Sequence, residues 1–274
     1  MENIKNKYYT GERTLFHQNN LNIEETIFND GESPLKESHD LNLKNTSFQW
    51  KYPLWYAHSV DVDDSSWLEM ARSGVWYTQH ININNSLIQA PKNFRRCTDI
   101  SLSHVFLPDA KETLWNCKDI KLDHVQANGD YFGMNSENIQ INHFQLTGNY
   151  CFDGAKNMEV HNARMLSKDA FWNTENVTVY DSIIHGEYIG WNSKNLTFIN
   201  CTIESLQGFC YINHLTLINC TLLNTTLAFE YSSVEADIRG RVESIMNPSS
   251  GHIKADEIGR LILNGDYVDP SQTT

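Results

Sequence analysis

The side chains best suited to chemistry in this sequence are tryptophans that recur at regular intervals. Neighbouring members of the row lie 19 to 21 residues apart where they are closest, and an arginine takes one of the places. The row consists of Trp55, Trp76, Arg95, Trp115, Trp172 and Trp191. Aromatic rings can stack on the apolar faces of sugar rings, and large exposed aromatic surfaces mark binding faces. The row therefore predicts an elongated carbohydrate-binding surface.

Charged and aromatic residues flank this row by a few positions. Those expected to contact a ligand are Arg72, Tyr131, Lys168, Glu187 and Tyr188. Those with the chemistry of catalytic groups are Asp130, Asp153, Asp169 and Arg96. A glycoside hydrolase uses two carboxylates, whereas a lyase needs a base such as arginine or lysine. These residues are candidates for either reaction, and the sequence does not select a pair among them.

A repeat must position these residues. The same short phrase begins at Ile139, Met158, Val177, Leu196 and Leu215, each 19 residues after the one before. The first and third residues of a phrase are apolar and the second is polar, as in a β-strand with one buried face. Further starting points, called anchors here, are Leu21, Leu41, Val60, Ile81, Ile100, Ile120, Val234 and Ile253. A fixed period of this length indicates a solenoid.

The predicted fold is all-β, a single-stranded right-handed parallel β-helix of about a dozen coils of 19–21 residues. We expect one domain over residues 1–274, with an N-terminal cap at 1–20, coils at 21–260 and a C-terminal strand and tail at 261–274. Asn, Asp or His follows most strands and suits a tight turn. His104, His124 and His143 share this place, where we expect a turn ladder because metal ligands converge on one point. No metal or cofactor is predicted.

The orientation of the tryptophans follows from the column beside them. One column lies six residues before each anchor and contains only apolar residues and glycine. The tryptophan column lies five residues before each anchor and also contains Arg95 and Asp153. Adjacent residues of an extended segment point to opposite faces, and an unpaired charge is costly in a dry core. We therefore expect the tryptophan column to face outward. Asp130, Asp153, Asp169 and Glu187 then lie on successive coils, within reach of one another.

Composition limits the partners and the compartment. The formal net charge of −13 disfavours a nucleic acid or an anionic membrane surface as partner. The N-terminus has no apolar run that resembles a signal peptide, so a cytoplasmic location is expected. The six cysteines form no C-x-x-C motif, but Cys97 with Cys117 and Cys201 with Cys220 fall at equivalent repeat positions. In a reducing compartment we expect these pairs to be free, buried thiols.

Several phrases resemble an uncharacterised bacterial family, a domain of unknown function whose members are expected to be right-handed parallel β-helices. They are Gly31-Glu-Ser-Pro-Leu-Lys-Glu-Ser, Trp50-Lys-Tyr-Pro-Leu-Trp-Tyr, Ala71-Arg-Ser-Gly-Val-Trp-Tyr, Gly129-Asp-Tyr-Phe-Gly-Met-Asn, Lys168-Asp-Ala-Phe-Trp-Asn and Gly186-Glu-Tyr-Ile-Gly-Trp-Asn. The resemblance runs nearly end to end. Some members carry a loose "hydrogenase" label, which scattered cysteines without paired spacing do not support. The coils are also distantly similar to the pectate-lyase-like superfamily, and such a fold alone does not transfer chemistry.

Three interpretations of the tryptophan row stay open at this point. It is an oligosaccharide-binding groove, with or without catalysis, or it is a protein interface of a non-enzymatic scaffold, most simply a homo-oligomer. Interfaces also enrich Trp, Tyr and Arg. In the third interpretation the segment bends, the rings turn inward and the flanking charges are simply solvated. The direction in which Trp115, Trp172 and Trp191 point decides among them.

Overall fold

Each turn of this chain is built from a longer strand, a tight turn and a shorter strand, and the next turn repeats the pattern in register. The computed structural model describes residues 1–263. The chain divides into unit 1, residues 1–140, and unit 2, residues 141–274. Each unit is a stretch of right-handed parallel β-solenoid, with about 14 turns in the chain. The described residues contain no helix, and hence none long and apolar enough to span a membrane.

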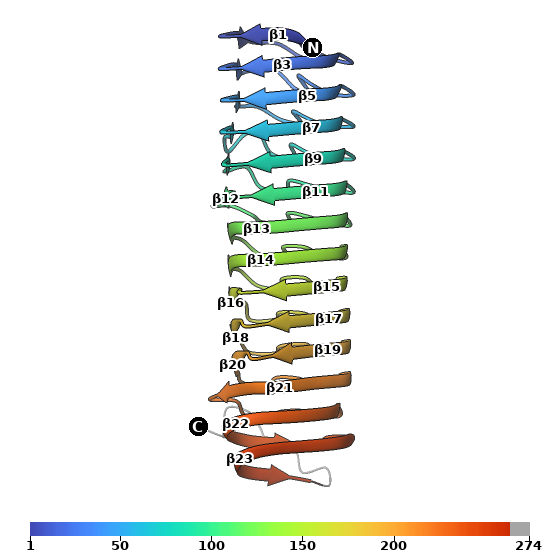
Figure 1. Cartoon of the computed structure of the whole chain (residues 1–274), viewed down its shortest axis with the longest axis vertical. Helices are drawn as coiled ribbons and strands as arrows, with labels where there is room; N and C mark the ends of the chain where they lie inside the picture. The colour runs from blue at the N-terminus through green and yellow to red at the C-terminus, as the bar shows by residue number, and fades with distance from the viewer. Residues whose placement is uncertain (264–274) are drawn as a thin grey trace. The chain divides into compact units, whose positions relative to one another are not determined.

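Unit 1 carries two columns of strands. In Figure 1 the longer strands of this unit are stacked in chain order from β1 to β13. The longer strands are β1 (Glu2–Lys5), β3 (Asn19–Glu24), β5 (His39–Lys44), β7 (His58–Asp63), β9 (Gln79–Asn84), β11 (Thr98–Ser103) and β13 (Lys118–Asn128). The shorter strands are β2 (Tyr8–Tyr9), β4 (Ile27–Phe28), β6 (Ser47–Phe48), β8 (Ser66–Trp67), β10 (Leu87–Ile88) and β12 (Phe106–Leu107). The division between the units falls within β14 (Glu137–Thr147).

Unit 2 repeats this arrangement. The longer strands are β15 (Lys156–His161), β17 (Glu175–Tyr180), β19 (Lys194–Ile199), β21 (Asn213–Leu223), β22 (Ser233–Met246) and β23 (Ser250–Ile262). The shorter strands are β16 (Arg164–Leu166), β18 (Ile183–Gly186) and β20 (Thr202–Ser205). The described strands of this unit pair in parallel. Val177 pairs with Leu196, and Leu196 pairs with Leu215 of the following coil. The predicted register of the anchors is confirmed here.

Turn residues explain the asparagine content. Asn162, Asp181 and Asn200 follow β15, β17 and β19, and Asn219 holds the equivalent place within β21. Their φ angles lie between 48° and 55°, in the left-handed region that Asn and Asp tolerate. Their side chains also join neighbouring coils. Asn219 donates to Asn200 at 2.6 Å, and Asn200 donates to Asp181 at 3.0 Å. In unit 1, His104 and His124 stack at 4.8 Å, which agrees with the predicted turn ladder.

The core is a set of buried columns. Leu196 and Phe198 are fully buried in β19, while the residues between and beside them are partly or fully exposed. Buried phenylalanines also stack from coil to coil, with Phe152 and Phe171 at 6.1 Å and Phe209 and Phe229 at 5.6 Å. Each coil alone would leave one side of these rings in water, so stacking supplies most of the apolar burial.

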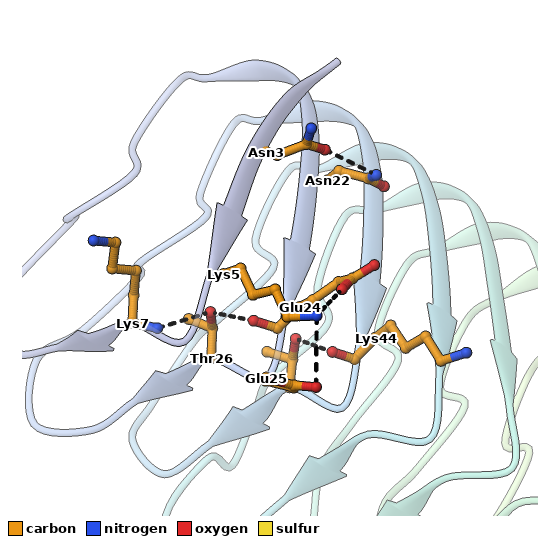
Figure 2. Close-up of polar contacts among 9 residues, drawn as sticks. Asn3, Lys5, Lys7, Asn22, Glu24, Glu25, Thr26 and Lys44 are labelled. Atoms are coloured by element: carbon orange, nitrogen blue, oxygen red, sulfur yellow. Dashed lines mark hydrogen bonds and ion pairs between the residues drawn. The ribbon is translucent and has the colours of Figure 1, made fainter.

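The two ends differ from the predicted pattern. Residues 1–20, expected as a cap, form a coil of their own, because Glu2 pairs with Leu21 and Ile4 with Ile23. Figure 2 shows how polar side chains bind this coil to the next: Asn22 donates to Asn3, and Lys5 lies 2.9 Å from Glu24. At the other end the anchor at Ile253 is wrong. Val234 pairs with Gly251, so the last coil is two residues shorter than the period. The predicted tail lies mostly outside the described residues.

Candidate functional site

The tryptophan column of unit 1 is a continuous stack and not an open row of ring faces. Trp55 and Trp76 lie parallel, with ring centroids 5.2 Å apart and planes 7° from each other. The guanidinium of Arg95 is inserted between the next two rings, 4.6 Å from the centroid of Trp76 and 4.6 Å from that of Trp115. These side chains are half-buried. Both faces of Trp76 are therefore occupied, one by Trp55 and the other by Arg95.

The indole nitrogens are also used within the chain. Trp76 Nε1 donates to the carbonyl of Lys92 at 2.8 Å, and Trp115 Nε1 donates to that of Tyr131 at 2.6 Å. Each bond connects one coil to the next. The indole N–H also supplies a hydrogen bond to a backbone carbonyl that would otherwise be partly buried without this donor. The column is a structural spine. The expectation of open ring faces is not met at Trp76, because Trp55 and Arg95 cover its two faces.

The backbone bends directly before Arg95 and Trp115. The residue before Arg95 and the one before Trp115, Phe94 and Leu114, have φ of 54° and 58°, as left-handed residues do. Gly133 and Gly190 hold the same place with φ of 76°. An extended segment would alternate cleanly between core and solvent, but a left-handed residue bends the chain. The column six residues before each anchor is buried as predicted, and the residue after it, in the tryptophan column, lies along the surface.

The other predicted residues of unit 1 do not converge on a site. Arg95 contacts Glu112 at 3.4 Å, and Lys92 contacts the same carboxylate at 3.3 Å. Arg96 is exposed and lies over the ring of Tyr77 at 6.0 Å. Arg72 is also exposed, while Asp130 and Tyr131 are half-buried in the coil that accepts the indole of Trp115. Glu112 thus pairs with Lys92 and Arg95, while Arg96 lies against an aromatic ring.

In unit 2 the aromatic column continues in the same style. Trp172 and Trp191 lie 5.9 Å apart, and Trp191 lies 4.7 Å from Tyr211. Trp172 Nε1 donates to the carbonyl of Tyr188 at 2.5 Å. Asp153, a predicted catalytic candidate, accepts from Asn173 at 2.8 Å. Asp153 therefore belongs to a surface amide ladder.

Several predicted residues of unit 2 do come together, around a buried carboxylate. Lys168 Nζ lies 3.3 Å from Glu187 Oε2 and 5.8 Å from the ring centre of Tyr188. Asp169, beside Lys168, is only 2% exposed. Burial raises the pKa of Asp169, and the charge of Glu187 adds to the rise, while Lys168 and a hydrogen bond from Tyr150 oppose it. Because Asp169 is buried, it does not reach a ligand at the surface in this conformation.

Beside this cluster unit 2 has a groove of about 700 Å³, within the range of small-molecule sites. Its lining comes from β18, β20, β22 and β23 and from the residues that follow β18, β20 and β21. The residues that line it are His185, Gly186, Glu187, Glu204, Leu206, Asn224, Thr226, Glu243, Ser244 and Arg260. Glu187 belongs to both the groove and the Lys168 cluster. We take this groove as the candidate functional site.

One wall of the groove is a short hydrogen-bonded chain of side chains. His185 Nδ1 lies 3.0 Å from Glu204 Oε2, and Asn224 Nδ2 donates to Glu204 Oε1 at 2.9 Å. The bond from Asn224 lowers the pKa of Glu204, and His185 acts in the same direction. Strand register produces this contact, because His185 pairs with Glu204 across β18 and β20. The carboxylate is thereby fixed in orientation, and the Nε2 edge of His185 is free to meet a ligand.

The far end of the groove is shaped by the last two strands. Arg241 contacts Glu243 at 3.2 Å and also binds Glu257. Arg260 pairs in register with Ser244 and is exposed. The structure shows no acidic partner for Arg260 among residues 1–263. Gly186 permits close approach at the near end, since a Cβ there would lie 2.2 Å from the carbonyl oxygen of Ser167.

Sequence reasoning found Glu187 but missed the rest of the lining. The aromatic row drew attention to the segment before each anchor, whereas the groove follows the segment after it. A signal was present, because His185 and Glu204 are polar residues one period apart at an outward strand position. The period alone does not distinguish such a pair from the many other polar pairs of the solenoid.

Unit 1 has a smaller hollow of about 220 Å³ on the outer side of its longer strands. Asparagines and acidic residues such as Asn42, Asp61 and Asp63 line it. Asn82 donates to Asp61 at 2.8 Å, and Asn85 donates to Asp63 at 2.9 Å. These side chains mainly bind each other from coil to coil, so the hollow is a weaker candidate than the groove of unit 2.

Comparison with known proteins adds a family and little else. A family model described as "Protein of unknown function (DUF3737)" matches residues 2–274. Among curated proteins no relative matches this sequence.

Similar solved structures include the A-module of a mannuronan C-5 epimerase from Azotobacter vinelandii, with 9% identity, TM-score 0.35, and coverage of 97% of this chain and 90% of that one. Endopolygalacturonase I from Stereum purpureum, complexed with two galacturonates, has 11% identity, TM-score 0.35, and coverage of 97% and 95%. The tailspike protein of E. coli bacteriophage HK620, in complex with a pentasaccharide, has 10% identity, TM-score 0.38, and coverage of 93% and 70%. Likenesses this distant say nothing of what the present chain binds.

Proposed function

The chain belongs to the DUF3737 family, whose description assigns no function, and we propose that unit 2 binds an oligosaccharide lengthwise in its groove. The observation that carries the proposal is the lining of the groove, in which carboxylates, an imidazole, an amide and a guanidinium follow one another from coil to coil. Such groups are the donors and acceptors that sugar hydroxyls require.

The bonding state of the lining supports this proposal. Glu187 and Glu243 each use one carboxylate oxygen for a cation, Lys168 and Arg241 respectively. For the other oxygen of each, and for Arg260, the structure of residues 1–263 shows no partner. A ligand rich in hydroxyls can therefore bind these groups without displacing an existing contact. Fixed polar groups that need no rearrangement reduce the cost of binding.

The dimensions of the groove favour a linear ligand. The lining begins at His185 on β18 and reaches Arg260 on β23, with β20, β21 and β22 between them. Neighbouring strands lie about 4.8 Å apart, so four steps span about 19 Å. This is the length of a short oligosaccharide. Leu206 supplies an apolar contact for the face of one ring.

The aromatic column has a supporting role in this proposal. Trp172 holds the backbone of Tyr188 through its indole nitrogen, and Tyr188 follows Glu187 of the groove. The column thus stabilises the coil that presents Glu187. Catalysis is not part of the proposal. The cytoplasmic location and the homo-oligomeric state expected from the sequence stay predictions.

The test is saccharide binding by the protein and by single-residue variants. A panel of neutral, amino and acidic oligosaccharides is screened on an array, and hits are measured by calorimetry. We expect Glu243→Gln and Asn224→Ala each to weaken binding at least about tenfold. The first variant removes a charged hydrogen-bond acceptor of the groove, and the second removes the side chain that orients the carboxylate of Glu204. Glu175→Gln is the matched control, because Glu175 is paired with Lys194 outside the groove. Either no binding across the panel or equal binding by all variants would refute the proposal.

A further inference from the structure

Two cysteines of unit 2 occupy neighbouring places in one buried column of the solenoid, and Ile238 follows them in register. Cys201 directly precedes β20, and Cys220 lies in β21 where Thr202 pairs with Thr221. Ser182 holds the same place one coil earlier, and its hydroxyl donates to the carbonyl of Tyr180 at 2.6 Å. Cys201 and Cys220 are 2% and 0% exposed. Their register places the two thiols face to face inside the solenoid.

The geometry of this pair suits a disulfide. Equivalent residues on adjacent parallel strands lie about 4.8 Å apart, and disulfide-bonded Cα atoms lie about 4.4–6.8 Å apart. Each sulfur lies near a backbone carbonyl two residues earlier, at 3.3 Å from Ile199 for Cys201 and 3.5 Å from Ile218 for Cys220. Each thiol also donates to a carbonyl of the preceding coil, Cys201 to Val179 at 3.4 Å and Cys220 to Phe198 at 3.3 Å. The two side chains therefore have equivalent surroundings on adjacent coils.

We propose that Cys201 and Cys220 form an oxidative modification site, which a small peroxide converts into a disulfide between adjacent coils. The proposal does not depend on the groove or on its ligand. It follows from the strand register, which places two buried thiols at equivalent positions of adjacent coils.

The chemistry assigns different roles to the two thiols. The neighbouring thiol of Cys201 lowers the pKa of Cys220, and the same interaction raises the pKa of Cys201. Cys220 is therefore the nucleophile. Its thiolate attacks one peroxide oxygen, the O–O bond breaks, and a sulfenic acid forms with release of hydroxide. The sulfur of Cys201 then attacks the sulfur of Cys220, the S–O bond breaks, and the oxygen leaves as water when it takes up the proton of Cys201. Two thiols and one peroxide thus give one disulfide and two waters.

The remaining cysteines are internal controls. Cys97 and Cys117 also lie at equivalent positions of adjacent coils, in unit 1, but burial raises the pKa of Cys117 and the neighbouring Cys97 adds to the rise. Cys151 and Cys210 are buried, and burial raises the pKa of each thiol to about 12. At the equivalent places of adjacent coils Cys210 has Trp191 and Phe229. A thiol in these settings reacts slowly or has no resolving partner.

The experiment exposes the full-length protein to increasing hydrogen peroxide, blocks free thiols after unfolding, and maps disulfides by mass spectrometry. We expect the Cys201–Cys220 bridge to form several-fold faster than a Cys97–Cys117 bridge, with Cys151 and Cys210 still free. Dithiothreitol should reverse the change. Cys220→Ser serves as the control, because serine already fits this column at Ser182.

The outcomes separate the proposal from general oxidation. The variant should keep the circular dichroism spectrum of the parent, lose the bridge, and leave the oxidation of the other four cysteines unchanged. The proposal is overturned if Cys201 and Cys220 stay reduced at doses that oxidise other cysteines, or at every dose that leaves the protein folded. It is equally overturned if their bridge forms no faster than the Cys97–Cys117 bridge.

Discussion

Replacing Trp76 by alanine should destabilise unit 1 by about 3 kcal/mol. Three contacts are removed with the indole. Its stack on Trp55 contributes about 1 kcal/mol, the cation–π contact with Arg95 about 1 kcal/mol, and the hydrogen bond to the carbonyl of Lys92 about 1 kcal/mol. An exposed tryptophan that waits for a ligand would contribute little to folding, since surface substitutions usually change stability by less than about 0.5 kcal/mol.

Two further substitutions make the measurement specific. Trp76→Phe keeps a ring in the stack but removes the indole N–H, so it should cost about 1 kcal/mol. Trp50→Ala removes a half-buried tryptophan outside the column, whose one described ring contact is Lys51 at 5.2 Å. That variant should cost at most about 1 kcal/mol.

The assay is urea unfolding followed by far-ultraviolet circular dichroism, since the variants themselves alter tryptophan fluorescence. Solenoids can unfold in stages, so hydrogen exchange of backbone amides in β7, β9 and β11 should accompany it. Exchange should accelerate there in Trp76→Ala. If Trp76→Ala costs no more than Trp50→Ala, the column is not a spine, and its ring faces are available to a ligand after all.

Two other predictions concern unit 2. Gly186→Ala should lower the stability of unit 2 by about 2 kcal/mol and weaken groove binding, because the new Cβ would lie 2.2 Å from the carbonyl oxygen of Ser167. Thermal unfolding measures the loss of stability, and an unchanged melting temperature contradicts the prediction. Asp169→Asn should stabilise unit 2 increasingly as pH rises. Folding raises the pKa of Asp169, so the wild type loses stability as pH rises from the unfolded value, about 3.9, through the folded one. Melting temperatures of both proteins from acidic to neutral pH give the difference, and a gap that does not vary with pH refutes the assignment.

Much of the fold follows from the repeat. The pairing of Val177 with Leu196 and the burial of Leu196 and Phe198 were predictable, because period and alternation both specify them. The same reasoning fails at the ends. Glu2 stands where an apolar anchor is expected, so the pattern hides the first coil. The pairing of β22 with β23 shifts between Ile238 and Arg241, which moves the last anchor from Ile253 to Gly251.

The tryptophan column shows why side-chain direction was harder to predict. Left-handed backbone at a phenylalanine or leucine is uncommon, and only Gly133 and Gly190 hinted at it. Phe94 and Leu114 accept this conformation because their side chains are fully buried. The following residue is then neither core nor open surface. Composition and spacing identify the column, but the local bend decides what covers the ring faces.

The position of the groove has a related physical cause. Along most of the solenoid a polar side chain finds its partner one coil away, as Asn195 does with Asn176 and Lys194 with Glu175. Such ladders leave little bonding capacity for a ligand. Near β22 and β23 the register shifts, Arg241 binds two acids, and Arg260 is left without one among residues 1–263. Side chains with hydrogen-bonding capacity left for a ligand therefore lie where the repeat is interrupted. Ligand specificity in this protein should depend on the C-terminal coils more than on the regular ones.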